Sequence, residues 1–423
     1  MTRLLIHGGR VFDGTGTAPA AADVAIEDGR IRHVGSGLDG DEAVDAGGLT
    51  ILPGLFDCHT HVVVSDVNMW RIAQTPFSYQ FYEAARNLAA TLHAGVTTVR
   101  DAGGADLGIK QAVANGLIAG PRMQISIIML SQTGGHGDDW LASGIEVPLF
   151  LPHPGRPSGV VDGPEEVRRM VRELLRAGAD VIKIATSGGV LSPRDDPRHG
   201  HFRDDELAVV SAEAEAAGVT VMAHAQGAPG IKAAIRAGVR SIEHGIFLDE
   251  EAISMMLEHG TFLVPTLVAP QGVIDAAAGG ASIPEAAVRK AREVVDIHRD
   301  AFRRAVEAGV RIAMGTDSGV TPHGENLREL ALMVAGGMTP VQALVATTRT
   351  AAELLGLASE LGTIETGKRA DLVLVSGDPL DFEGLSGRVR AVYQDGLLVA
   401  GSRTPSPAQN GAATPSASAA TAM

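Results

Sequence analysis

Short apolar stretches alternate with glycine-containing turns over the first fifty residues. Apolar residues at 4–7, 24–27 and 31–34 are separated by Gly-Gly or Asp-Gly pairs, which favour tight reversals of the chain. This pattern predicts short β-strands joined by turns near the N-terminus.

From about Gly54 the rhythm changes, because short apolar stretches now alternate with longer segments of helical character. The strand candidates are 55–61, 96–101, 124–130, 180–185, 220–224, 241–244, 261–267 and 311–316. Between two of them, the segment from Pro164 to Ala177 has proline at its start and glycine after its end, as helices commonly do. Eight such strands alternating with helices predict an α/β fold, namely a (β/α)8 TIM barrel with a parallel sheet.

Glycine turns and short strands return after the last helix predicted from this pattern, which ends near Leu355. We expect residues 1–53 and 356–401 to form the two parts of a small β-sandwich domain, with the barrel over 54–355 between them. Residues 402–423 are rich in Ala, Ser, Pro and Thr and have almost no large apolar side chain. This tail is therefore expected to be disordered.

The net charge narrows the range of partners. The 423 residues carry a formal charge of −15, with 45% hydrophobic and 20% charged residues, which disfavours binding to nucleic acid or to an anionic membrane. No apolar run approaches the roughly 18 residues that span a bilayer, and the apolar part of the N-terminus is too short for a secretory signal. Cys58 is the only cysteine, so an internal disulfide is excluded. We expect a cytoplasmic protein that acts on a small molecule.

Candidate metal ligands occur at the ends of the predicted strands. His59 and His61 stand two residues apart at the end of the first barrel strand, so their side chains point to the same face. Imidazole is the commonest metal-binding side chain. Four further candidates end or follow later strands: Lys183, His224, His244 and Asp317. Since the C-terminal strand ends of a parallel barrel carry its catalytic groups, we expect all six side chains to converge on one mouth.

An ordered series of motifs identifies the likeness of this chain to a known family. They are 53–61 (PGLFDCHTH), 95–103 (GVTTVRDAG), 134–138 (GGHGD), 181–189 (VIKIATSGG), 222–224 (MAH), 242–245 (IEHG), 315–317 (GTD) and 368–373 (KRADLV). In these motifs the chain resembles the amidohydrolase superfamily, within the group of imidazolonepropionase-like and Xaa-Pro dipeptidase-like hydrolases. The resemblance extends over about residues 4 to 400.

The resemblance implies a site with two divalent cations. One cation would be held by His59, His61 and Asp317, and the second by His224 and His244. Lys183, carboxylated to N6-carboxylysine, would bridge both, because an ammonium has no lone pair whereas a carbamate offers two anionic oxygens. A hydroxide bridging the cations would attack the substrate carbonyl, and Asp317 would pass its proton to the leaving nitrogen. Zinc suits the histidine-rich ligand set, with manganese, cobalt and iron as alternatives. Relatives commonly assemble into homo-oligomers.

Four residues are candidates for substrate binding. His136 has the position of a substrate-contacting histidine that could stabilise an oxyanion. Arg194 and His201, in the loop after Lys183, could receive a substrate carboxylate, although interleaved acids make a solvated loop an equal alternative. Gln226 replaces a histidine that this family often has at that place, which puts peptidase specificity in doubt.

The sequence therefore predicts a metal-dependent amidohydrolase that cleaves a C–N bond, most plausibly of a dipeptide or N-acyl amino acid, as a prolidase or carboxypeptidase does. The alternative substrates are aryl amides such as ochratoxin-type amides, ureas, carbamates or cyclic amides. A third alternative is a metal-stabilised binding protein without activity. Lys183 could also simply pair with an acid, and Asp317 could cap a helix.

Overall fold

The computed structural model describes residues 2–192 and 194–403. Strands from the N-terminal region form a four-stranded sheet in the order β5-β4-β1-β6. Its members are β1 (Leu4–His7), β4 (Asp23–Glu27), β5 (Arg30–Gly35) and β6 (Glu42–Asp45). The three strands predicted near the N-terminus are thus confirmed. The expected disordered tail lies outside the described residues from position 404 onward.

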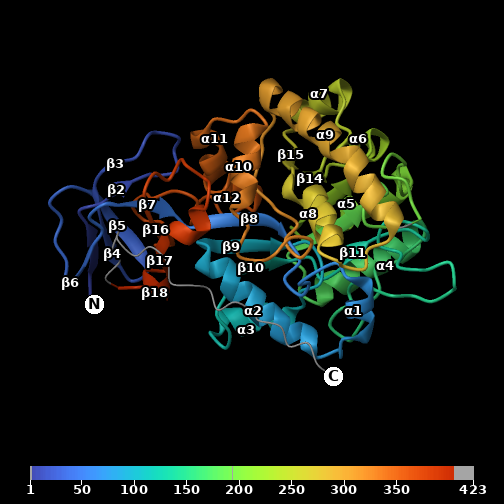
Figure 1. Ribbon diagram of the computed structural model, residues 1–423, viewed down its shortest axis with the longest axis horizontal. Helices are drawn as coiled ribbons and strands as arrows, with labels where there is room; N and C mark the ends of the chain where they lie inside the picture. Colours follow the sequence, from blue (N-terminus) through green and yellow to red (C-terminus); the bar gives the residue numbers. More distant parts are fainter. Residues whose placement is uncertain (1, 193, 404–423) are drawn as a thin grey trace.

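A second sheet is built from both ends of the chain, in the order β18-β17-β16-β7-β2-β3. Its members are β2 (Arg10–Val11), β3 (Ala20–Ala21), β7 (Leu49–Pro53), β16 (Leu372–Ser376), β17 (Val389–Gln394) and β18 (Leu397–Gly401). β7 and β16 pair antiparallel at the centre, so the blue and red parts of the chain lie side by side in Figure 1. One buried cluster, which includes Ile6, Ile51 and Leu372, joins the two sheets. The domain boundaries given above stay a prediction.

Parallel strands occupy the middle of the chain. They are β8 (Leu55–Thr60), β9 (Val96–Asp101), β10 (Arg122–Ile125), β11 (Met129–Leu130), β12 (Val181–Ala185), β13 (Thr220–Ala225), β14 (Ser241–His244) and β15 (Phe262–Val264). They pair in the orders β10-β9-β8 and β11-β12-β13-β14-β15. The third predicted strand is split into β10 and β11, because Ile127 between them takes a left-handed backbone conformation with φ of 70°.

Backbone hydrogen bonds connect the two groups of parallel strands into a ring. The Asp180 N–H donates to the carbonyl of Ile125 at 2.8 Å, and the Leu263 N–H donates to that of Arg311 at 2.9 Å. The Cys58 N–H donates to the carbonyl of Met314 at 2.9 Å, which brings the segment 311–316 beside β8. The mixed α/β fold with a parallel sheet is confirmed, and this ring is the arrangement expected of the (β/α)8 barrel.

The eighth predicted strand, 311–316, is not a regular strand. It makes an isolated bridge between Ile312 and Leu263, and its Met314 N–H bonds a helix residue, Ala346, rather than a neighbouring strand. A ladder needs consecutive bonds to one neighbour, and here the bonds are divided among several. The segment still occupies the predicted place in the ring.

Helices lie around these strands (Figure 1). They are α1 (Met69–Gln74), α2 (Tyr79–His93), α3 (Leu107–Ala114), α4 (Gly163–Arg176), α5 (Asp204–Ala216), α6 (Ala228–Arg236), α7 (Glu250–His259), α8 (Val268–Ala278), α9 (Glu285–Ala308), α10 (Arg328–Ala335), α11 (Pro340–Ala346) and α12 (Arg349–Leu354), with a 3-10 turn at Leu385–Arg388. The predicted helix at 164–177 is α4, and it buries Val167, Met170, Val171 and Leu174 on one face. Within the described residues, no helix combines the length and apolar character needed to cross a membrane.

Candidate metal centre

The two histidines of the first barrel strand point their Nε2 atoms at Asp317. His59 Nδ1 bonds the carboxylate of Glu243 at 2.8 Å, and His61 Nδ1 bonds the carbonyl oxygen of Gly103 at 2.8 Å. Their Nε2 atoms lie 3.5 Å and 3.1 Å from Asp317 Oδ1. Because each Nδ1 donates its proton to an oxygen, each Nε2 keeps a lone pair for a cation.

His244 and His224 complete the imidazole set. Ligand atoms of His59, His244 and Asp317 all lie within 4.8 Å of one another. The His224 ring centroid is 4.7 Å from that of His244, and its Nε2 bonds the carbonyl of Gly188 at 3.1 Å. His244 Nδ1 bonds the hydroxyl of Thr266 at 2.7 Å. The structure thus brings together the five predicted imidazole and carboxylate ligands, which come from four separate parts of the sequence.

Lys183 lies in the same place with no hydrogen-bond partner for its Nζ atom among the described residues. It stands on β12, and only 1% of the residue is exposed. Burial lowers the pKa of its amine to about 8, so a substantial fraction is neutral near physiological pH. An unpartnered buried amine that loses its proton readily fits the chemistry of carboxylation, because only the neutral amine can add to carbon dioxide.

The pKa shifts of His59, His224, His244 and Asp317 fit a divalent cation, whereas burial acts to lower the pKa of His61 but its bond to Asp317 outweighs burial and raises it. Burial lowers the pKa of His59 to about 4, and it also holds those of His224 and His244 well below their ordinary value. Burial acts to raise the pKa of Asp317, but its bond to His61 and the nearby His59 outweigh this and keep the carboxyl ionised. Neutral imidazoles beside a carboxylate form the donor set that zinc and similar ions prefer.

A buried ion pair that the sequence reasoning missed supports His59. Arg100 on β9 donates from Nη2 to Glu243 Oε1 at 2.9 Å and from Nε to the carbonyl of Cys58 at 2.7 Å. Burial acts to raise the pKa of Glu243, but the Arg100 charge and the His59 bond hold it well below its usual range. The sequence contained a signal, because charged residues within apolar strands imply an interior pair.

Asp57 is a second residue that was missed. Its carboxylate accepts hydrogen bonds from the Thr316 hydroxyl at 2.6 Å, the Asn326 amide at 2.8 Å and the His59 N–H at 3.1 Å. It therefore ties the segment that carries Asp317 to the strand that carries His59. Burial raises its pKa to about 6 despite these bonds. Its place two residues before His59 was the available signal.

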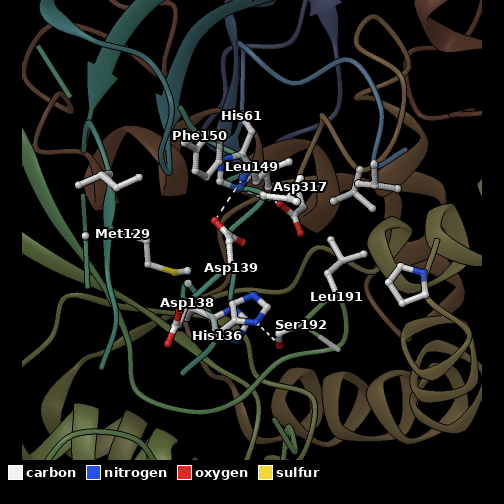
Figure 2. Close-up of a pocket in the computed structure, with 18 of the residues that line it drawn as sticks. His61, Met129, His136, Asp138, Asp139, Leu149, Phe150, Leu191, Ser192 and Asp317 are labelled. Carbon is white, nitrogen blue, oxygen red and sulfur yellow. Dashed lines mark hydrogen bonds and ion pairs between the residues drawn. The ribbon is translucent and has the colours of Figure 1, made fainter. Parts of the chain in front are cut away.

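The predicted ligands open into a cavity of about 420 Å³ (Figure 2). His59, His61, Lys183, His224, His244 and Asp317 all line it. Most of its remaining wall is apolar and includes Ile128, Met129, Leu141, Val147, Leu149, Phe150, Leu191 and Val320. Asp138 and Asp139 also line the cavity, whereas Lys183 is the one lysine or arginine among its described lining residues. A smaller recess of about 40 Å³ adjoins it at His136, His224 and His244.

Of the four predicted substrate-binding residues, two line the cavity or the recess and two do not. His136 lines both the cavity and the recess, and Gln226 lines the recess. Arg194 is exposed and lies over the Trp140 ring at 5.0 Å, and His201 is buried beside the loop, with its N–H bonded to the carbonyl of Thr186. Neither Arg194 nor His201 lines the cavity or the recess.

Comparison with known proteins agrees with this geometry. The model of the amidohydrolase family matches residues 50–400. Ochratoxinase of Aspergillus niger is 35% identical over 399 residues, which cover 89% of this chain and 82% of that protein. Its crystal structure has a TM-score of 0.83 at 34% identity, covering 95% of this chain and 96% of that one. A Xaa-Pro dipeptidase with bound methionine in the active site has a TM-score of 0.85 at 36% identity, covering 94% and 99%. The resemblance inferred from the motifs is confirmed.

Proposed function

This chain belongs to the amidohydrolase family, and on that premise we propose that it hydrolyses a carbon–nitrogen amide bond with the help of two divalent cations. The observation that carries the proposal is the convergence of four histidines, Asp317 and the unpartnered Lys183 on one cavity. His59, His61 and Asp317 would hold one cation, and His224 and His244 the other. Lys183 as N6-carboxylysine would bridge them. Zinc suits this ligand set, with manganese, cobalt or iron as alternatives.

Asp317 is the proposed general base and acid. When bound, the cations activate a water molecule and polarise the scissile carbonyl. The Asp317 carboxylate, kept ionised by His61 and His59, takes the proton from that water and returns it to the leaving nitrogen. Asp57 holds Thr316, the residue before Asp317, and Arg100 holds Glu243, the partner of His59, which preorganises the site for this transfer.

The cavity wall supports an amide substrate with a bulky apolar group. We propose a dipeptide or N-acyl amino acid with a large aliphatic or aromatic side chain, because the residues around the ligands are mainly apolar. Arg194, the candidate partner for a substrate carboxylate, does not line the cavity. Recognition therefore depends on apolar contact more than on a salt bridge to a substrate anion.

An aryl amide is the second candidate substrate. The observation that favours it is again the apolar wall, in which Phe150 lies against His61 with ring centroids 5.3 Å apart. The likeness to ochratoxinase, whose name indicates a mycotoxin substrate, points in the same direction. Hydrolysis of ureas, carbamates or cyclic amides has no comparable support from the residues of the cavity.

The test is metal analysis combined with a panel of substrates. We expect the purified protein to contain close to two equivalents of divalent metal and to lose activity on chelation and regain it with zinc, manganese or cobalt. The panel compares N-acyl amino acids with large and small side chains, Xaa-Pro dipeptides, aryl amides and ureas. Absence of bound metal, with no turnover of any amide after metal addition, would contradict the proposal.

A cytoplasmic location and a homo-oligomeric assembly also belong to the proposal. Light scattering on the eluting protein, with the 43.7 kDa chain mass as reference, measures the number of subunits directly.

A further inference from the structure

A lysine from the outer helix α9 enters the loop that follows β12. Lys290 Nζ donates to the carbonyls of Gly189 and Ser192 at 2.6 Å each, and it lies 3.0 Å from the carbonyl of Asp195 and 3.2 Å from its Oδ1. The lysine is buried, and so is the Asp195 side chain. A buried lysine is costly unless its charge is paired and its protons are bonded. Here both conditions are met by one loop.

The Asp195 carboxylate connects Lys290 to Ser192. Its Oδ1 accepts a hydrogen bond from the Ser192 hydroxyl, and its Oδ2 accepts one from the Gly189 N–H at 3.0 Å. The charge of Lys290 balances that of the carboxylate. Both carboxylate oxygens are thus fixed, one toward the loop backbone and one toward the serine.

The serine contacts His136, the histidine at the wall of the cavity. Ser192 Oγ lies 2.8 Å from His136 Nδ1, and the two side chains point toward each other in Figure 2. The hydroxyl has one proton, and its other neighbours, Asp195 Oδ1 and the Gly189 carbonyl, can only accept. The proton therefore goes to one of these oxygens, and the serine oxygen accepts the N–H of His136 Nδ1.

The ring of His136 is also confined by two further contacts. It stacks on His224 with centroids 4.0 Å apart and an interplanar angle of 15°. On another side it lies against the backbone of Gly189, where an added Cβ would approach the ring to 2.1 Å. This contact gives a physical reason for glycine at position 189, which the sequence alone did not explain. The ring has little freedom to rotate or flip.

We propose that Ser192, Asp195 and Lys290 are positioning residues that hold His136 with its Nδ1–H bonded to Ser192 and its Nε2 presented to the cavity. Nε2 has no partner among the described residues, and the ring lines the cavity. The substrate then meets an Nε2 atom whose position is fixed. The oxyanion-stabilising role expected from the sequence stays a prediction. The proposal rests on the proposed function only in taking this cavity as the reaction site.

A double-mutant cycle on the metal-loaded enzyme separates positioning from loop stability. We expect Ser192→Ala to lower kcat about tenfold with KM and metal content nearly unchanged, while Ser192→Thr, which keeps the hydroxyl, recovers most of the activity. In a His136→Asn background the same Ser192→Ala change should have little further effect, because the two residues act as a unit. Lys290→Met should resemble Ser192→Ala. Equal losses in both backgrounds would overturn the proposal.

A second readout does not depend on turnover. Long-range ¹H–¹⁵N spectra of protein with ¹⁵N-labelled histidine distinguish a protonated Nδ1 from a protonated Nε2, and the His136→Asn variant identifies the signals of His136. We expect the Nδ1–H pattern in the wild type and its loss in Ser192→Ala. An Nε2–H pattern in the wild type would overturn the proposal. If no amide were hydrolysed, the proposed function would fail while this test remained decisive.

Discussion

The metal centre and the cavity wall differ in how their residues are held. Most candidate ligands stand on or directly after β8, β12, β13 and β14, where strand pairing fixes the backbone, and Asp317 follows the segment 311–316. Much of the wall comes from loops, among them 131–152 and 186–192, which have few strand bonds of their own. The candidate ligands are thus placed on the part that strand pairing holds, and much of the cavity wall on loops.

The loops are nevertheless anchored, by single buried side chains that reach in from elsewhere. Lys290 of α9 anchors the loop after β12. Arg156 bonds the carbonyl of Leu151 at 2.8 Å and the Gln80 amide oxygen at 2.6 Å, which holds the other loop against α2. The two regions are therefore held by different interactions. Repeated backbone hydrogen bonds position the candidate ligands, whereas individual ionic side chains position the loops of the cavity wall.

The largest effect is expected at the centre of the rigid region. Lys183→Ala should lower kcat by at least about 10³-fold, because the proposed N6-carboxylysine would be a ligand of both cations, its loss would remove several kcal/mol of stabilisation, and each 1.4 kcal/mol or so is tenfold. Metal content measured on the same sample should fall together with activity.

Short-chain carboxylic acids provide the control for Lys183→Ala. Acetate or propionate can occupy the space of the missing side chain and offer two anionic oxygens, so part of the activity should return. Full activity of the variant without any added acid would show that Lys183 is not a functional part of the site.

The next largest effect is expected at Glu243, which orients the candidate ligand His59. Glu243→Gln should weaken metal binding about 10- to 100-fold, because the acceptor that orients His59 loses its charge while Arg100 keeps its own. Competition with a chromophoric chelator measures this change. Glu206→Gln is the matched control, since Glu206 is also buried but bonds the N–H groups of Gly163 and Arg203 instead. Equal loss in both variants would show that burial alone, rather than the contact with His59, causes the effect.

The two regions also differ in how well their residues could be predicted from the sequence. Spacing of two residues placed His59 and His61 on one face, and the ends of apolar stretches marked Lys183, His224 and His244. The partners Arg100 and Glu243 are 143 positions apart, and no local pattern pairs them. Arg194 was a reasonable candidate by charge, but the side chain lies over Trp140 outside the cavity. Residues fixed by strand register were predictable, whereas residues fixed by distant contacts were not.

A smaller effect should follow from a change in the wall. Leu191→Ala should lower kcat/KM about tenfold for an amide with a bulky apolar group, because removing three carbons from the wall costs about 1–2 kcal/mol of contact. An N-acetyl amino acid with a small side chain should be hydrolysed nearly as before. If kcat/KM fell equally for both substrates, Leu191 would act on the metal centre rather than on specificity. The contrast between the cavity wall and the metal centre would then be weakened.

The smallest effect on activity is expected at a residue behind the metal centre, where the change appears in stability instead. Glu329 of α10 accepts the N–H groups of Leu267 and Val268 at 2.7 Å and 2.9 Å, next to the Thr266 hydroxyl that bonds His244. Burial raises its pKa to about 8 from an ordinary value of 4.5. Between these values the folded state holds a proton that the unfolded state has released. The contribution of this group to stability is therefore present at low pH and falls as pH rises, by up to about 1.4 kcal/mol per pH unit.

Glu329→Gln removes this titration, because an amide does not ionise in the window. The variant loses one acceptor and should be less stable at every pH, but that loss is constant and cancels when slopes are compared. Urea unfolding of metal-saturated protein at pH 5, 6.5 and 8 should show stability falling more steeply for the wild type than for the variant. Parallel slopes would mean that Glu329 is ionised throughout, with its charge stabilised by the two N–H groups. The segment 266–268, next to His244, would then be held by an ionised carboxylate. Helix α10, which carries Glu329, would therefore also belong to the rigid support of the metal centre.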